Sequence, residues 1–137
     1  MTTPPGATPS TTTASSPNDR SLNLVILEGV LARAPLARAL PSGDTLLELE
    51  VSTRRPGQRA DTVPVTLFSA PRSVEQLDAG AGVVVLGRVQ RRFYRAHGRA
   101  QSRTGVTADR VVPTGHRRRV AAVLQRARAA IDELVSD

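Results

Sequence analysis

Residues 87–99, GRVQRRFYRAHGR, concentrate basic and aromatic side chains in a chain that has few aromatics. This stretch holds two of the three aromatic residues of the protein and five of its 19 arginines. An aromatic ring offers a surface on which a nucleobase can stack, and a guanidinium group pairs with phosphate or stacks on a base. The alternative interpretation is a basic strand end that carries two packing residues.

Side-chain alternation along residues 82–94 separates this predicted strand into two faces. Val83, Val85, Gly87 and Val89 form the set that suits a sheet interior. Phe93 falls on the same face, so we expect it to pack in the core. The opposite face, which we expect to be exposed, carries Arg88, Gln90, Arg92 and Tyr94.

Phe68 is the last residue of another predicted strand, residues 62–68. Alternation places its ring on the face of that strand opposite to the face of Val65 and Leu67. We therefore expect Phe68 to face outward. Residues 88–103 carry six arginines and no acid, a pattern that suits a groove following a phosphate backbone. Outward aromatics with arginines between them favour binding over packing.

The sequence shows no catalytic constellation. His97 and His116 are isolated and the chain has no Cys, so a metal site is not expected. There is no nucleophile–base pair, P-loop or dinucleotide fingerprint. Asp44, Glu48 and Glu50 lack a partner base, and we expect them to form a solvated face that repels phosphate. We predict a protein that is not an enzyme and needs no cofactor, metal or small-molecule substrate.

Composition points to an anionic partner. The net charge is +7 and the isoelectric point is near 11.6, which favours a nucleic acid first and a membrane surface second. No apolar run approaches the ~20 residues that span a bilayer, and residues 1–20 lack the apolar core of a secretory signal. We expect no membrane partner and a cytoplasmic location.

Three segments differ in composition. Residues 1–20 are rich in Thr, Ser and Pro and are predicted to be disordered, because they cannot bury enough apolar surface. Residues 21–114 are predicted to be mainly β, with a short helix between the third and fourth strands. This element order is that of the five-stranded Greek-key barrel called the OB-fold. The predicted elements are strands within 22–36, 44–52, 62–68, 82–94 and 102–112, and a helix within 69–80.

Residues 115–137 are predicted to form an amphipathic helix. Its charges oppose the helix dipole, with Arg117–Arg119 in the first turn and Asp132 and Glu133 near the end. A helix of this length needs packing to be stable in water. Its apolar side chains recur at helical spacing and form one stripe, which is Val120, Val123, Leu124, Ala127, Ile131 and Leu134. We expect this stripe to lie against the barrel of its own chain or another subunit and to contribute to self-association.

Several motifs in order resemble the bacterial single-stranded-DNA-binding (SSB) family. They are NLVILEGVLARAP, then LPSG, then VTLF, then GVVVLGRVQRRFY. The resemblance covers roughly residues 22–112. It implies an OB-fold that forms a dimer or tetramer and wraps single-stranded DNA without sequence preference. It also implies a nucleoid-associated protein of DNA replication, repair or recombination.

Individual positions follow from this resemblance. Phe68 matches the family's stacking Phe, and Tyr94 falls where the family usually has Trp. Thr62 replaces a second Trp, and Arg54 and Arg55 lie where a further aromatic is expected. The acidic C-terminal tip of the family has no counterpart, which makes this chain a divergent member. The candidate nucleic-acid-binding residues are Phe68, Arg88, Arg91, Arg92, Tyr94, Arg95, Arg99, Arg103, Arg54 and Arg55.

We therefore expect largely sequence-independent, non-catalytic binding of single-stranded DNA by an oligomeric OB-fold protein, with RNA binding by the same face as a variant. The alternative is an OB-fold interaction or assembly module that has lost most DNA binding. Loss of aromatics favours the alternative, and the arginine-rich residues 88–103 favour DNA binding.

Overall fold

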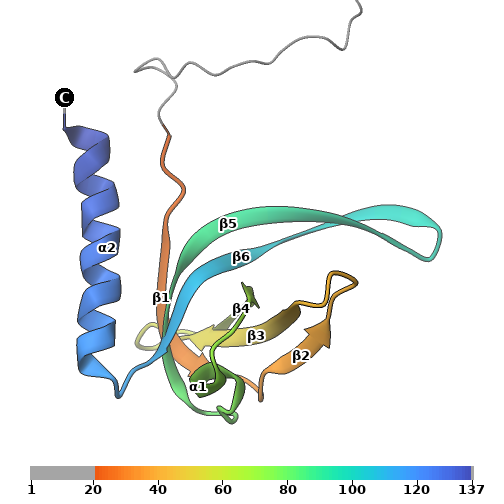
Figure 1. Ribbon diagram of the computed structural model, residues 1–137, viewed down its shortest axis with the longest axis horizontal. Helices are drawn as coiled ribbons and strands as arrows, with labels where there is room; N and C mark the ends of the chain where they lie inside the picture. The colour runs from red at the N-terminus through yellow and green to blue at the C-terminus, as the bar shows by residue number, and fades with distance from the viewer. Residues whose placement is uncertain (1–20, 137) are drawn as a thin grey trace, which may run out of the picture.

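The computed structural model describes residues 21–136, so the predicted disorder of residues 1–20 lies outside the described part of the chain. Within the described residues the fold is mainly β, with one six-stranded sheet and two helices (Figure 1). The sequence predicted five strands. The first of them, within 22–36, is β1 (Val25–Leu31) and ends earlier than predicted. After a bend that ends at Pro35, which has no backbone N–H to donate, a sixth strand that the sequence did not predict follows, β2 (Leu36–Ala39).

Strands β3 (Thr45–Thr53) and β4 (Asp61–Phe68) form a regular antiparallel hairpin with pairs running from Leu46–Phe68 to Thr53–Asp61. The alternation expected of β3 is confirmed. Its apolar set is fully buried, whereas the carboxylates of the opposite set are about one-third exposed. The buried set is Leu47, Leu49 and Val51, and it forms the centre of the core.

The helix predicted between the third and fourth strands is confirmed but is a single turn, α1 (Arg72–Glu75). Pro71 precedes its first residue, where the missing N–H costs nothing. Val74 is fully buried and joins the core of the sheet. α1 therefore closes one end of the core with one side chain.

Strands β5 (Gly82–Ala96) and β6 (Arg99–Pro113) are the longest elements and pair antiparallel along their whole lengths. His97 and Gly98 connect them, with φ values of 53° and 75°. Positive φ at both central residues is typical of the type I′ turn, whose twist matches that of the flanking strands. The loop expected at residues 95–101 is thus only two residues, and both strands continue further than the sequence predicted.

The strand order is β1-β5-β6-β4-β3-β2, and β1 also pairs with β3. β1 makes both pairings because it passes from β5 to β3 near Gly29. A Cβ at this position would lie 2.2 Å from the carbonyl oxygen of Ser52, so only glycine permits the approach. Gly29 therefore marks this close crossing of β1 and β3.

The C-terminal helix is confirmed as α2 (Arg117–Val135). It stands beside the sheet on the side of β1 (Figure 1). One edge of its stripe packs on its own sheet, where Val123 and Ala127 are buried against Val84, Leu86 and Val112. The other edge remains exposed and consists of Leu124, Ile131 and Leu134. Within residues 21–136 no helix is long and apolar enough to cross a membrane.

Candidate nucleic-acid interface

The end of the β5–β6 hairpin extends beyond the rest of the sheet (Figure 1). β1 pairs with β5 only as far as Gly87, and β4 pairs with β6 only from Val106. Beyond those residues the two strands pair with each other alone. Both faces of this hairpin end, residues 90–104, are therefore accessible.

This geometry overturns one prediction. Phe93 was expected to pack in the core, but its side chain is 73% exposed. Alternation separates an interior from an exterior face only where other elements cover one face, and none covers the hairpin end. The guanidinium group of Arg91 lies 5.7 Å from the centre of the Phe93 ring, within the range of a cation–π contact. Phe93 is thus available for stacking.

Tyr94 is on the opposite face of the same strand and is 45% exposed. Its hydroxyl group donates a hydrogen bond of 3.3 Å to Oε1 of Gln101, its cross-strand partner. This contact fixes one edge of the ring and leaves a face of the phenol open. A rigid, half-exposed ring of this kind can accept a stacked base.

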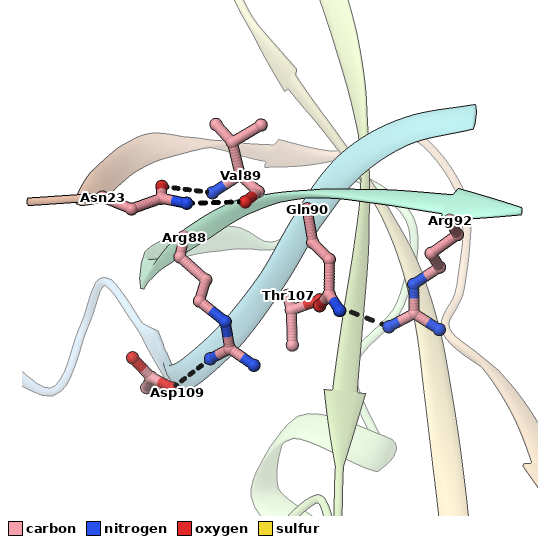
Figure 2. A network of polar contacts seen from close by, with 7 residues as sticks. All are labelled: Asn23, Arg88, Val89, Gln90, Arg92, Thr107 and Asp109. Atoms are coloured by element: carbon pink, nitrogen blue, oxygen red, sulfur yellow. Dashed lines mark hydrogen bonds and ion pairs between the residues drawn. The ribbon is translucent and has the colours of Figure 1, made fainter. Parts of the chain in front are cut away.

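Phe68 lies at the end of β4 and is 44% exposed, as the sequence predicted for its face. The guanidinium group of Arg92 lies 5.6 Å from the centre of its ring. Nη2 of Arg92 also donates to Oγ1 of Thr107 at 3.2 Å, and the Thr107 hydroxyl in turn donates to Gln90 (Figure 2). A buried threonine therefore holds Arg92 in place beside the ring.

The base of the hairpin is fixed by two further contacts, shown in Figure 2. The Asn23 side chain donates to the carbonyl oxygen of Val89 and accepts from its N–H, both at 2.8 Å. Arg88 forms an ion pair of 3.3 Å with Asp109. Asp109 is skipped in the register of β5 with β6, because that register shifts between Leu86 and Gly87. The predicted binding residue Arg88 is therefore already paired with a carboxylate.

A cavity of 730 Å³ lies where the hairpin end curves over β3 and β4, and we call it the hairpin cavity. Its arginines come from three separate segments of the chain. Glu48 and Glu50 also line it, but they form ion pairs of 3.0 Å with Arg38 and 2.8 Å with Arg33. The predicted phosphate-repelling face is therefore largely neutralised. The arginines and aromatics of the cavity wall are Arg33, Arg38, Arg91, Arg92, Arg103, Phe93 and Tyr94.

The other predicted residues lie apart from this cavity. Arg95 and Arg99 are exposed on either side of the turn at the hairpin tip. Arg54 and Arg55 follow β3, at the end of the β3–β4 hairpin opposite Phe68. The structure thus brings together Phe68, Arg91, Arg92, Tyr94 and Arg103, and it does not bring Arg54 and Arg55 to them.

Sequence reasoning missed Arg33 and Arg38. Arg33 belongs to the predicted strand 22–36 but lies in the bend before β2, and Arg38 lies in β2, which is mostly beyond that predicted strand. The pairing of β2 with β3 places this segment beside the cavity. The one usable signal was the pair of outward carboxylates on β3, which need cationic partners when they are partly buried.

The side chains of this arrangement are of kinds that bind. Exposed rings and arginine side chains surround a groove, and among residues 21–136 no group of three or more His, Asp or Glu could hold a metal ion. Aromatic rings within a basic groove are what a flexible strand of stacked bases requires.

Comparison with known proteins identifies the family. A search of the curated proteins found none with significant similarity to this chain. The model of the single-strand binding protein family matches residues 22–114, which include all six strands and the α1 turn. This match covers about two-thirds of the sequence and agrees with the motif order of the strands. The chain belongs to the single-strand binding protein family.

Proposed function

We propose that this protein binds single-stranded DNA through the hairpin cavity and its rim, largely without regard to sequence. Binding of single-stranded DNA, without catalysis, is the general property of its family. The observation that carries the proposal is the exposed Phe68 ring with Arg92 beside it. Arg92 also lines the hairpin cavity, together with Tyr94 and three further arginines of the hairpin and β2, which are Arg91, Arg103 and Arg38. These contacts recognise phosphates and base faces, which every sequence has.

The strand pairing supports an OB-fold of the Greek-key barrel type as the scaffold. β1 pairs with β5 on one side and with β3 on the other, so five strands are joined in a closed circuit of neighbours. The family's fold places its nucleic-acid surface on one face and in the loops of such a barrel.

Within this proposal the rings and the arginines have different roles. Phe68, Tyr94 and the exposed Phe93 stack on bases, and Arg91, Arg92 and Arg103 pair with phosphates. Arg95 and Arg99 extend the basic surface to the hairpin tip. Arg88 contributes less, because Asp109 already holds its guanidinium group. Arg54 and Arg55 bind a later part of a strand that continues around the molecule.

Fluorescence anisotropy with labelled oligo-dT and with a duplex of the same length tests this function. We expect tighter binding of oligo-dT at moderate salt, because stacking requires unpaired bases. Affinity should fall steeply with salt as counterions are released from the DNA. Equal affinity for duplex and single strand, or affinity that does not respond to salt, contradicts the proposal. Competition with oligo-U then distinguishes DNA from RNA binding.

A second candidate function is assembly, and the exposed edge of α2 favours it. Leu124, Ile131 and Leu134 lie on a helix whose other edge is already packed on the sheet. We propose that this edge contributes to a homo-oligomer, as the family typically forms. A protein with these two properties acts at the nucleoid, in replication, repair or recombination.

A further inference from the structure

A second cavity lies between α2 and the sheet, and of the binding residues in the proposal above only Phe68 lines it. It measures 790 Å³, and we call it the α2 groove. Phe68, Ser69 and Pro71 form one wall at the end of β4. Arg110 of β6 and two side chains of α2 lie across from them, and these two are Arg119 and Arg126.

The charge of the α2 groove is strongly positive. Among the described residues no ion pair involves Arg110, Arg119 or Arg126. The one carboxylate in the wall is Asp109, which pairs with Arg88 at 3.3 Å. Three arginine side chains therefore face the groove without an anionic partner from residues 21–136.

The spacing of the two helical arginines suits a repeating anion. Arg119 and Arg126 are seven residues apart, so they lie on one side of α2 and about 10 Å apart along its axis. Phosphates of one strand repeat at shorter intervals than this, at about 3.4 Å of rise per nucleotide in B-DNA. The two guanidinium groups can therefore reach different phosphates of one backbone.

The start of α2 is unfavourable for the helix itself. Its first turn consists of Arg117, Arg118 and Arg119, and that turn contains no acidic residue. Cations next to the positive end of the helix dipole cost about 0.3–1 kcal/mol each. An anion bound in the α2 groove would offset the part of this cost that comes from Arg119, which lines the groove.

Phe68 connects the α2 groove to the hairpin cavity. Its ring lines the groove, and the guanidinium group of Arg92 lies 5.6 Å from the same ring while also lining the hairpin cavity. A strand that leaves the cavity across Phe68 therefore enters the α2 groove directly.

We propose that the α2 groove binds the phosphate backbone of the same DNA strand, so that α2 is part of the nucleic-acid interface. The inference rests on the proposed function. It extends that function to a helix that lies outside the family match at residues 22–114. Arg110, Arg119 and Arg126 are the residues that contact phosphate in the groove.

Paired charge-removal variants test the proposal. Arg119→Ala/Arg126→Ala removes two charges from the groove, and Arg118→Ala/Arg128→Ala removes two from sides of α2 that do not line it. Alanine favours the helix in both variants, so α2 is retained, and circular dichroism checks this. Affinity is measured over a range of salt concentrations. The two probes are oligo-dT of about 6 nucleotides and of about 24 nucleotides, near the lower end of the usual range of roughly 4–16 nucleotides for one OB-fold and above that range.

We expect the groove variant to lower the salt slope for the long probe by about 1.4, the value for two lost phosphate contacts with a single strand. The control variant should lower it by less than half as much. The short probe, held at the hairpin cavity, should bind both variants alike. Equal slopes for the two variants with the long probe overturn this inference and leave the proposed function standing. Absence of oligo-dT binding by the unmodified protein overturns both.

Site-specific photocrosslinking gives a second readout. The chain has no cysteine, so Ala122→Cys in the groove wall and Ala121→Cys on a neighbouring side of α2 can each carry one benzophenone label. We expect the long oligo-dT to crosslink from position 122 at least several-fold more than from position 121. Similar yields at both positions would place the DNA elsewhere and overturn the proposal.

Discussion

Tyr94 is held by one hydrogen bond and leaves a ring face open, which makes it the clearest single test of stacking. Tyr94→Ala should weaken oligo-dT binding by about 1–3 kcal/mol, because one stacked base is lost while no core residue changes. Tyr94→Phe keeps the ring and loses only the bond to Gln101, so it should bind nearly as the unmodified protein does. Anisotropy titration measures both. Unchanged affinity in Tyr94→Ala would favour the assembly function.

Arg92 combines a cation–π contact with a charge, and its loss should have a different signature. Arg92→Ala should lower the salt slope of oligo-dT binding by about 0.7, the value for one phosphate contact. Arg72→Ala is the matched control, since Arg72 is exposed on α1 and lines neither cavity. A slope that falls equally in both variants would mean that only net charge matters.

Asn23 binds the backbone of Val89 through two hydrogen bonds, just before β1 begins to pair with β5. Asn23→Ala should reduce the free energy of unfolding by about 1–2 kcal/mol, because each such bond contributes about 0.5–1.5 kcal/mol. Asn23→Asp can still accept from the Val89 N–H but places a carboxylate oxygen against the Val89 carbonyl oxygen, so it should also destabilise the fold. Thermal unfolding followed by circular dichroism measures the difference. An alanine variant as stable as the unmodified protein contradicts this role.

At the scale of elements, alternation predicted well wherever a strand has one covered face. It identified the buried side of β3 and the outward position of Phe68 at the end of β4. It failed for Phe93, because a free hairpin end has no interior. In the first half of β5 consecutive residues are buried, since the core covers Val83 and Val85 and α2 covers Val84 and Leu86.

Local pattern could not reveal the early end of the first predicted strand, the additional strand β2 or the α2 groove. Where β1 stops depends on its crossing to β3, and the walls of the α2 groove come from segments about 50 residues apart in the chain. Such arrangements depend on tertiary contacts that no window of sequence contains. The motif order nevertheless identified the family, because the glycines and aromatics it uses mark strand ends and crossings.

Gly87 shows why one such glycine is required. It lies at the register shift of the β5–β6 hairpin, and a Cβ there would be 2.3 Å from the carbonyl oxygen of Thr107 and 2.9 Å from Cα of Ala108. These backbone atoms of β6 cannot move away without disturbing its pairing with β5. Gly87→Ala should therefore destabilise the fold by roughly 2–4 kcal/mol, within the range of strongly destabilising substitutions.

The control for this prediction is Gly115→Ala. A Cβ at Gly115 would meet nothing within 4 Å, and its φ is not in the left-handed region. The control should change stability by no more than about 0.5 kcal/mol. Denaturant unfolding compares the two variants, and similar midpoints would show that the hairpin absorbs the extra carbon.

At the scale of the whole molecule, α2 both covers the sheet and presents an apolar edge. Leu124→Gln/Ile131→Gln should leave the helix folded and lower the mass measured by light scattering, if this edge holds subunits together. Truncation after Gly115 should in addition lower the melting temperature, because it uncovers Val84 and Leu86. If both variants keep the mass of the unmodified protein, the edge is not an assembly surface.

The crossing of β1 between β5 and β3 has a consequence for how the chain reaches this structure. β1 is synthesised about 55 residues before its partner segment Gly82–Gly87. At roughly 5–20 residues per second the ribosome makes that partner about 3–11 s later. Until then β1 can pair only through its last residues, Val30 and Leu31. α2, which covers the outer side of β5, emerges later still. The nascent chain therefore exposes an unpaired apolar strand for seconds, and this interval is where chaperone binding and misassociation compete with folding.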